Sequence, residues 1–258
     1  EIRWWKGNLH THSLWSDGDQ FPEMVAEWYK SHGYHFIAFT EHDCIQEGHR
    51  EIALDPAVAD LESFPERAHL DYALTDYRAR FGTNWVLPIT SANDRYVVTL
   101  RELREYREMI EEDQRFLILQ GEEITVQHPD GQHWANVFNL VEPIPAQRGD
   151  STRAGMDAVF SSTEQQALAT GHRIIVQLNH PNYMYNIQAD KIAAIEKLKF
   201  MEIHTALNST QCYGDAQHAG VERIWDEVLT MRLGRTHLGI VYGTATDDIH
   251  FFYPEVDR

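Results

Sequence analysis

Residues 7–18 of the chain have the sequence GNLHTHSLWSDG, and residues 35–43 have the sequence HFIAFTEHD. The first segment carries His10 and His12, which are two residues apart. Because side chains alternate between the two faces of a strand, both imidazoles would project to the same side of a strand here. Two imidazoles on one face can bind one metal ion. The pair therefore makes this segment a candidate metal-binding strand.

Two further candidate ligands follow within the same stretch. Asp17 lies in a turn-prone Ser-Asp-Gly, and His42 lies between Glu41 and Asp43, just after the apolar run at 36–39. A His-x-His pair by itself is more often a surface or hydrogen-bonded pair than a metal site. The additional carboxylate and histidine, at predicted strand ends, favour metal binding instead.

The length and composition of the chain favour one large soluble domain. Its 258 residues exceed the common domain size of about 150 residues, but single α/β barrels reach about 250 residues. Hydrophobic residues make up 43% of the chain, which supplies a sizeable core, and no apolar run is long enough to span a bilayer. The net charge of −18 opposes binding to long nucleic acid and to anionic membranes. No membrane partner is therefore expected, and part of the acidity can serve bound cations.

The cysteines and the chain start leave the cellular compartment open. Cys44 and Cys212 form neither a C-x-x-C pair nor a dense disulfide framework. Cys44 follows the TEHD segment and could lie near a metal, although a half-buried thiol is the more common state of such a residue. The chain begins at Glu1 rather than Met, which is compatible with a removed signal peptide; otherwise a cytoplasmic location is expected. The oligomeric state stays open.

The first elements predict a βαβ unit. Residues 22–32 begin with Pro, carry apolar residues at helical spacing and end before Gly33, so they predict a helix. This helix joins a predicted strand at 7–12 to a predicted strand at 35–40. Strands connected in this way are normally parallel.

Residues 45–115 interrupt this alternation and predict an insertion. Segments at 56–61 and 66–82 predict helices, the second of which ends at a glycine. Segments at 85–90 and 95–100 flank a short polar loop and predict a β-hairpin.

The end of the insertion is helical and basic. Thr99 and Glu102 form a capping box that predicts a helix to about residue 113. The insertion is rich in arginine, and Arg95 is the candidate to bind a substrate phosphate. The alternative is that these arginines alternate with glutamates on a solvated helix face.

After the insertion, strands and helices alternate again. Three candidate ligands, Glu123, His180 and Asp248, follow predicted strands. In a (β/α) barrel the C-terminal ends of the strands converge on one mouth, so such ligands would meet there. His133 lies instead at the start of a strand, which this arrangement does not explain. The strands are predicted at 116–120, 134–140, 173–178, 200–204 and 238–242, and the helices at 162–170, 189–198 and 221–232.

Two of the ligand positions have a competing neighbour in the sequence. Asp248 and His250 are two residues apart and would share a strand face, which favours Asp248 over Asp247. The adjacent carboxylates Glu122 and Glu123 would point to opposite faces of a strand, so only one of them can face the ligand cluster.

The motifs HTHSLWSDG, TEHD, GEEIT, NHP and TATDDIH, in this order, resemble those of the PHP family. This is the polymerase and histidinol phosphatase superfamily of metal-dependent phosphoesterases. The resemblance covers nearly the whole chain apart from residues 45–115. It implies an α/β fold with a distorted (β/α)7-type TIM-like barrel and an inserted helical and hairpin segment, in a single domain over residues 1–258. It also selects Glu123 over Glu122 and His133 over His128.

By this resemblance the chain would bind two or three divalent metal ions, such as Zn, Mn or Fe, in neighbouring sites. Some family members have histidine at the position of Asp17. The carboxylate suits harder ions such as Mn²⁺ better than imidazole does. The first ion would be bound by His10, His12, Glu123 and Asp248, the second by Glu123, His133 and His180, and the third by Asp17, His42 and His250.

The activity implied is hydrolysis of a small phosphomonoester or phosphodiester, with a metal-bridging hydroxide as nucleophile. Glu123, Asp248 and His250 are the expected catalytic residues. Glu202, at the end of a predicted strand, would contact the substrate or orient the ligands. The sequence contains no Gly-x-Ser-x-Gly elbow, P-loop or Gly-x-Gly-x-x-Gly motif that would indicate another chemistry.

Two other functions remain open at the level of sequence. A PHP-type exonuclease acting on short oligonucleotides would need a cationic track for the backbone. A non-catalytic module could retain the metal cluster without activity. The candidate ligands at all nine positions argue against the second alternative, and the net charge of −18 argues against the first. A small phosphorylated substrate is the expected partner.

Overall fold

The structure is a computed structural model that describes residues 4–53, 70–86, 90–92, 95–129 and 131–252. The chain divides into two compact units, and each is described by itself. Among the described helices, none combines the length and the apolar character that crossing a membrane requires. Unit 1 comprises Glu1–Glu41, Gln46–Leu119 and Ile249–Arg258, and unit 2 comprises His42–Ile45 and Gln120–Asp248.

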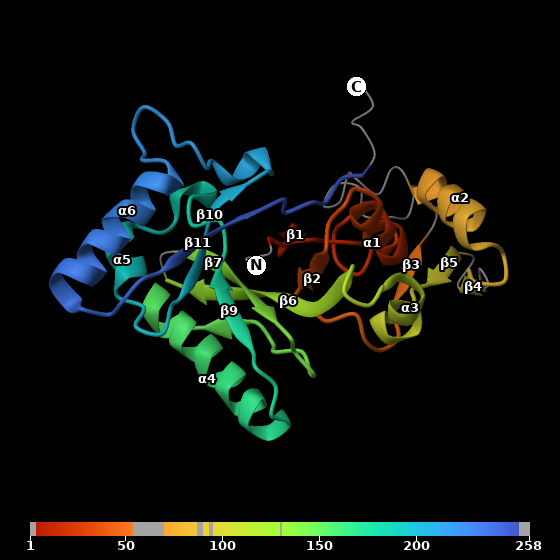
Figure 1. Cartoon of the computed structure of the whole chain (residues 1–258), viewed down its shortest axis with the longest axis horizontal. Helices are drawn as coiled ribbons and strands as arrows, with labels where there is room; N and C mark the ends of the chain where they lie inside the picture. Colours follow the sequence, from red (N-terminus) through yellow and green to blue (C-terminus); the bar gives the residue numbers. More distant parts are fainter. Residues whose placement is uncertain (1–3, 54–69, 87–89, 93–94, 130, 253–258) are drawn as a thin grey trace. The chain divides into compact units, whose positions relative to one another are not determined.

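The helices and strands follow one another along the chain as labelled in Figure 1. The first half contains β1 (Gly7–Asn8), α1 (Pro22–Ser31), β2 (Phe36–His42), β3 (Glu51–Ala53), α2 (Leu70–Phe81), β4 (Thr90–Ala92), β5 (Arg95–Thr99), α3 (Leu103–Ile110), β6 (Leu117–His128) and β7 (Gly131–Phe138). The second half contains β8 (Gln147–Arg148), α4 (Thr152–Thr170), β9 (Ile175–Leu178), η2 (Tyr183–Tyr185), α5 (Ala189–Ala193), β10 (Phe200–Thr205), η3 (Asn208–Thr210), α6 (Val221–Met231), η4 (Arg232–Thr236) and β11 (Tyr242–Thr246).

Unit 1 is built around the βαβ unit that the sequence predicts. β1 pairs in parallel with β2, and α1 connects them. α1 begins at Pro22, whose fixed φ suits the first helical turn, and Gly33 follows its end with a positive φ of 75°. The buried side chains of Val25 and Tyr29 belong to the same core cluster as Leu103 of α3. The predicted helix and parallel strand pair are confirmed.

The insertion forms a small antiparallel sheet in unit 1. Its strands are ordered β3-β5-β4. β4 and β5 pair antiparallel as predicted, but β4 spans Thr90–Ala92, in the predicted loop, rather than residues 85–90. α2 ends at Phe81 before Gly82, as expected, whereas the helix predicted at 56–61 lies outside the described residues. The predicted capping box is wrong in position. Thr99 pairs with Glu51 in the sheet, so α3 is capped by Glu102, whose backbone N–H donates to Glu105 Oε2 at 2.8 Å.

Unit 2 contains most of the main sheet and three of the helices. β6 and β7 form an antiparallel pair, β7 is antiparallel to β9, and β9, β10 and β11 are parallel. Figure 1 shows α5 and α6 side by side, and α4 packs against both α5 and β7. One core cluster, which includes Val126, Val137, Val159 and Met201, joins these strands and helices.

Several predicted boundaries in unit 2 are wrong. β6 continues to His128 rather than ending at residue 120, so Glu123 lies within this strand and not after it. α4 begins at Thr152 rather than near residue 162, because Ser151 caps it by accepting a hydrogen bond from the Ala154 N–H. α5 ends at Ala193 rather than at residue 198. β11 begins at Tyr242, the residue at which a strand was predicted to end, because the π-helical turn η4 carries the chain past residue 236.

The strands of the main sheet follow the order β1-β2-β6-β7-β9-β10-β11. In unit 1 an isolated parallel bridge also joins Thr11, just after β1, to Ile249. This seven-strand series with its connecting helices confirms the predicted α/β fold class, a distorted (β/α)7-type TIM-like barrel. The antiparallel β7 is the main distortion of the regular parallel pattern.

Candidate metal centre

In unit 1, His10 and His12 converge although they lie beyond the end of β1. The Nε2 atoms of the two rings are 3.1 Å apart, and both side chains are fully buried. Asn8 holds the segment by donating from Nδ2 to the carbonyl of His10 and to Thr11 Oγ1, each at 2.8 Å. The two imidazoles therefore meet because this turn is fixed, not because they share a regular strand as predicted.

The hydrogen bonds around His12 define its protonation. Ser16 donates its only hydroxyl proton to Glu41 Oε2 at 2.5 Å, so its oxygen is left to accept from His12 Nδ1 at 3.1 Å. With the proton on Nδ1, the lone pair of His12 Nε2 is directed at the neighbouring His10. This is the tautomer that binds a metal through Nε2.

Glu41 is a supporting residue that the sequence did not single out. Its carboxylate is fully buried and accepts from Ser13 Oγ at 2.5 Å and from Gln46 Nε2 at 2.8 Å, besides Ser16. These bonds anchor the Ser13–Ser16 turn that carries His12. Glu41 directly precedes His42 in TEHD, so its side chain points to the opposite face of the strand. This position was the sequence feature that could have indicated a supporting role.

Asp17 and His250 complete the cluster of unit 1. Asp17 Oδ1 lies 3.4 Å from His12 Nδ1, and Asp17 Oδ2 lies 3.3 Å from His250 Nε2. The rings of His12 and His250 stack with centroids 4.1 Å apart. Four of the predicted ligands, from both ends of the chain, are thus neighbours within unit 1.

In unit 2, Glu123 lies between two histidines. Its side chain is 1% exposed, with Oε2 3.0 Å from His42 Nδ1 and Oε1 3.1 Å from His180 Nε2. Asn179 Nδ2 also donates to Glu123 Oε1 at 2.8 Å. The two carboxylate oxygens of Glu123 thus face different imidazoles, as a bridging ligand would require.

Asp248 lies beside the same histidine. Its Oδ2 is 3.9 Å from His180 Nε2, and its positive φ of 50° breaks the strand alternation on which the sequence argument relied. Burial alone would lower the pKa of His180. The hydrogen bond and charge of Glu123, with the charges of Asp248 and Glu202, raise the pKa overall. Unit 2 thus concentrates negative charge around a buried imidazole.

Polar side chains behind Glu123 and His180 fix their positions. Asn179 Nδ2 also donates to Asn136 Oδ1 at 2.7 Å. Glu202 accepts from the backbone N–H of His180 at 2.8 Å and from Thr246 Oγ1 at 2.7 Å. The structure therefore places Glu202, 1% exposed, against the loop that carries His180. Asn136 and Asn179 were missed, although Asn179 directly precedes His180.

His133 lies on the other face of the sheet from Glu123. Glu123 pairs with Asn136 and Val126 pairs with His133, without a register shift between them, so alternation sends the two side chains to opposite faces. On the side of Glu123, the corresponding position is taken by Trp134, whose ring lies 5.4 Å from that of His180. The structure thus brings eight predicted ligands into two clusters, one in each unit, and leaves His133 apart.

The remaining predicted residues lie outside these clusters. The backbone of Arg95 belongs to β5, but its side chain is not among the described ones. Cys44 is a half-buried free thiol.

The donor atoms of both clusters suit divalent cations. Neutral imidazoles with carboxylates in buried, preorganised positions are ligands for Zn²⁺, Mn²⁺ and Fe²⁺. The two Nε2 atoms are 3.1 Å apart in a fully buried position. Without an ion, they could share at most one hydrogen bond. The residues present therefore fit a metal centre.

Comparisons with known proteins give similar folds. No family model matches the chain, and no curated protein matches it. Three solved structures are similar over nearly its whole length, although the chain spans only 52% of the first of them.

The first similar structure is a two-domain protein from Bacteroides vulgatus containing a predicted PHP-like metal-dependent phosphoesterase, with 18% identity, 96% of this chain covered and a TM-score of 0.48. The second is a proposed metal-dependent phosphoesterase from Bifidobacterium adolescentis, with 13% identity, 97% of this chain and 89% of the other covered, and a TM-score of 0.44. The third is PsfC from Pseudomonas syringae, with 13% identity, 95% and 75% coverage and a TM-score of 0.43.

Proposed function

We propose that this chain is a metal-dependent phosphoesterase that hydrolyses a small phosphomonoester or phosphodiester. The observation that carries the proposal is the position of Glu123, whose two oxygens lie 3.0 Å from His42 and 3.1 Å from His180. A buried carboxylate that faces two imidazoles in opposite directions is suited to share divalent ions. The clustered His10 and His12 of unit 1 supply a second set of donors of the same kind.

Divalent ions bound to these residues would polarise the phosphoryl oxygens, lower the pKa of a water so that hydroxide can attack, and stabilise the leaving alkoxide. The chain's own residues do the positioning. Asn179 holds the Glu123 carboxylate, and Glu202 holds the backbone of His180. In this proposal Glu123, Asp248 and His250 are the catalytic residues, because each would hold an ion next to the reacting phosphoryl group.

The proposed complement is two or three divalent ions, of Zn, Mn or Fe. Asp17, which lies 3.3 Å from His250, adds a carboxylate to a cluster otherwise made of imidazoles. Carboxylate ligands favour harder ions such as Mn²⁺. The placement of His133 away from Glu123 removes one donor from the predicted second ion, so that ion would rely on Glu123, His180 and solvent.

The net charge favours a small substrate over a nucleic acid. A nuclease neutralises several backbone phosphates with Lys and Arg, and this chain carries 22 of these against 40 Asp and Glu. Three divalent ions would add only about six positive charges to the −18 of the chain. An exonuclease on short oligonucleotides is the alternative activity, and a non-catalytic module is the alternative of another class.

The test is a substrate panel on protein that has been stripped with chelator and reloaded with Mn²⁺ or Zn²⁺. The panel contains aryl phosphomonoesters, linear and cyclic phosphodiesters and a single-stranded oligonucleotide. We expect hydrolysis of at least one small ester that is lost on stripping and restored by metal.

The control is the Glu123→Gln variant, prepared and reloaded in parallel to exclude a contaminating phosphatase. Preference for the oligonucleotide, abolished by salt, would favour the exonuclease. Absence of turnover on every substrate, in protein that retains its ions, would favour the non-catalytic module.

A further inference from the structure

A second pair of histidines lies on the face of β6 and β7 that does not carry Glu123. His128 pairs with Gly131 and His133 pairs with Val126, so the two imidazoles are diagonal neighbours on one face of the antiparallel pair. Their ring centroids are 5.2 Å apart. Both side chains are buried, with exposures of 7% for His128 and 2% for His133.

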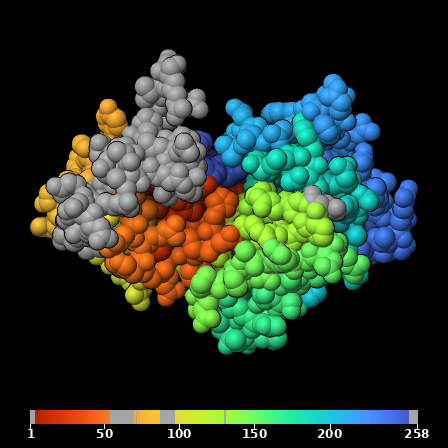
Figure 2. Space-filling model, turned by 180° about the vertical axis from the view of Figure 1, so that it is seen from behind, coloured from red at the N-terminus to blue at the C-terminus, as the bar shows by residue number. Residues whose placement is uncertain are grey.

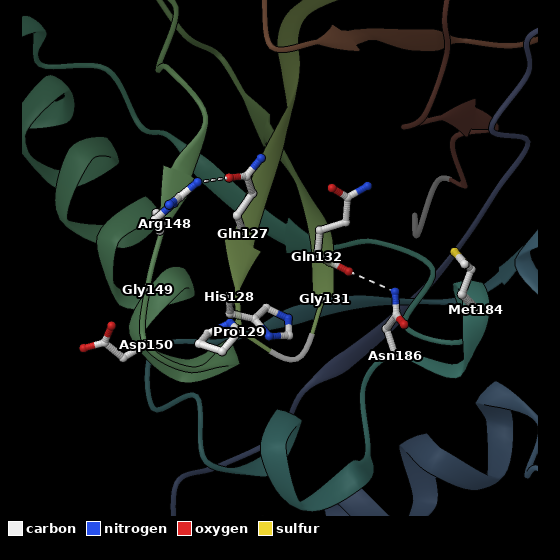
Figure 3. Close-up of a pocket in the computed structure, with 10 residues that line it drawn as sticks. All are labelled: Gln127, His128, Pro129, Gly131, Gln132, Arg148, Gly149, Asp150, Met184 and Asn186. Carbon is white, nitrogen blue, oxygen red and sulfur yellow. Dashed lines mark hydrogen bonds between the residues drawn. The ribbon is translucent and has the colours of Figure 1, made fainter. Parts of the chain in front are cut away.

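His128 lines a cleft of about 680 Å³ in unit 2, and His133 is its buried neighbour. Figure 3 shows the His128 ring at the end of the hairpin, between the Gly149–Asp150 segment and Asn186. Arg148 is engaged with Gln127 Oε1 through a 2.6 Å hydrogen bond, and Asn186 with the carbonyl of Gln132. Figure 2 shows the surface of the hairpin and of α4, in yellow-green and green, adjoining on one side of unit 2.

His133 has unused ligand capacity in an apolar environment. Neither of its ring nitrogens has a hydrogen-bond partner among the described residues. α4 closes over it, because a Cβ added at Gly155 would lie 3.9 Å from His133 Cε1 and 2.4 Å from Val126 Cγ1. Burial, and then the neighbouring His128, lower the pKa of His133 to about 3, so its ring is neutral at physiological pH. Burying an imidazole without hydrogen bonds is unfavourable, and a bound partner would offset this cost.

The separation and the tilt of these two rings are close to those of His10 and His12 in the candidate metal centre. The rings of His10 and His12 have centroids 5.1 Å apart and planes tilted by 48°. The rings of His128 and His133 have centroids 5.2 Å apart and planes tilted by 42°. In the first pair the two Nε2 atoms are 3.1 Å apart. The second pair shares the ring separation and the tilt.

We propose that His128 and His133 form a separate two-histidine site for a first-row transition metal ion at the head of the hairpin cleft. Zn²⁺, Cu²⁺ and Ni²⁺ are the ions that neutral imidazoles prefer. Water in the cleft supplies the remaining coordination positions, since the described residues contain no third His, Cys, Asp or Glu ligand grouped with this pair. This site does not depend on the proposed phosphoesterase function.

The test measures bound Zn²⁺ by elemental analysis after dialysis at a buffered free concentration. The variants are His128→Gln and His133→Gln, and the matched control is His172→Gln, an exposed histidine of the same unit. We expect each of the first two variants to bind one equivalent fewer than wild type, and the control to bind the wild-type number. Addition of Zn²⁺ should also raise the melting temperature of the control more than that of either variant.

Equal stoichiometry in all four proteins would overturn the proposal, because the pair would then be packed without an ion. A second measurement on wild-type protein guards against misfolded variants. Protein preloaded with Zn²⁺ is dialysed to remove weakly bound ions and receives one equivalent of Cu²⁺. An electron paramagnetic resonance spectrum that shows two nitrogen ligands in wild type, and loses them in His133→Gln, supports the site. A spectrum that this substitution does not change contradicts it.

Discussion

Glu122 and Glu123 are adjacent in β6 and almost equally buried, yet their surroundings differ completely. Glu123 faces His42, His180 and Asn179. Glu122 accepts one hydrogen bond, from the Ile144 N–H at 2.8 Å, and its other oxygen has no hydrogen-bond partner among the described residues. Burial raises the pKa of Glu122 to about 8. The hydrogen bond from Ile144 only partly opposes this shift, and the charge of Asp43 adds to it.

Two histidines, His180 and His133, repeat the contrast. The partners of His180 raise its pKa in spite of burial, whereas burial lowers the pKa of His133 to about 3. Strand alternation sends one set of side chains into a polar cluster and the other into an apolar layer. A buried group keeps its charged form when partners of opposite charge surround it, and it becomes neutral when apolar groups surround it.

The largest expected effect is a difference in catalytic activity between variants of Glu123 and Glu122. Glu123→Gln should lower kcat/KM for a small phosphoester by about 10³-fold or more, because it removes a charged ligand placed between two histidines. Asp17→Asn, which affects only the cluster of unit 1, should cost about 10–100-fold. Glu122→Gln should stay within about threefold of wild type. Steady-state kinetics on metal-loaded proteins measure all three, and equal losses at Glu122 and Glu123 would break the comparison.

A second prediction concerns a buried charge whose hydrogen-bonding capacity is fully used. The guanidinium of Arg232, 1% exposed, donates to backbone carbonyls that include Ile195, Leu198 and Gly239. Arg232→Met should lower the free energy of unfolding by about 3–5 kcal/mol, because several buried carbonyls lose their partner. Arg235→Met, at an exposed position, should change it by about 0.5 kcal/mol or less. Chemical denaturation measures both, and similar values would contradict the role of Arg232.

A third prediction uses Glu23, a buried carboxylate that, like Glu122, has neutral partners. It accepts from Tyr77 Oη at 2.7 Å and from Trp85 Nε1 at 3.3 Å. Burial, which these bonds only partly oppose, raises its pKa from 4.5 to about 7. The native state therefore retains a proton that the unfolded state loses, so stability falls as the pH rises from 4.5 to about 7. The loss is on the order of 3 kcal/mol and is complete above that window.

Glu23→Gln removes this titration. Its stability relative to wild type should rise across the same pH window and then remain constant. Denaturation at pH values from 4 to 8 measures the difference, with Glu47→Gln as the exposed control. A difference that does not change with pH would show that Glu23 keeps an ordinary pKa.

The smallest effect is expected from salt. Turnover of a small phosphoester should change by less than about twofold between low and moderate ionic strength, because its contacts would be with buried groups and bound ions. Kinetics at the two salt concentrations test this, with the oligonucleotide as comparison. A steep decline for the small ester would indicate that exposed cations, rather than the buried clusters, bind it.

Local sequence signals were sufficient for several parts of this molecule. Helix α1 has a Pro at its start and a Gly after its end. The antiparallel pairing of β4 and β5 was also predicted, although β4 lies later in the chain than expected. The clustering of His10 and His12 was predicted from their spacing of two, although it depends on hydrogen bonds from Asn8 and not on a regular strand. Signals within a few residues were enough for these features.

Features that depend on distant contacts could not be predicted. The face of β7 that His133 occupies depends on its register with β6, and a shift of one residue exchanges His133 and Trp134. The apolar residues at 238–242 were expected to form a strand. Arg232 binds the carbonyls of Leu238 and Gly239, so part of this segment is held in an irregular turn and β11 begins only at Tyr242.

The most direct test of the account is the number of divalent ions that Glu123→Gln and Glu122→Gln retain after reloading with Mn²⁺ or Zn²⁺. Both variants replace one buried carboxyl group by an amide, at adjacent positions of the same strand. The account predicts that Glu123→Gln binds at least one equivalent fewer than wild type in elemental analysis, and that Glu122→Gln binds the wild-type number. A full complement of ions in Glu123→Gln, or an equal loss in Glu122→Gln, would contradict it.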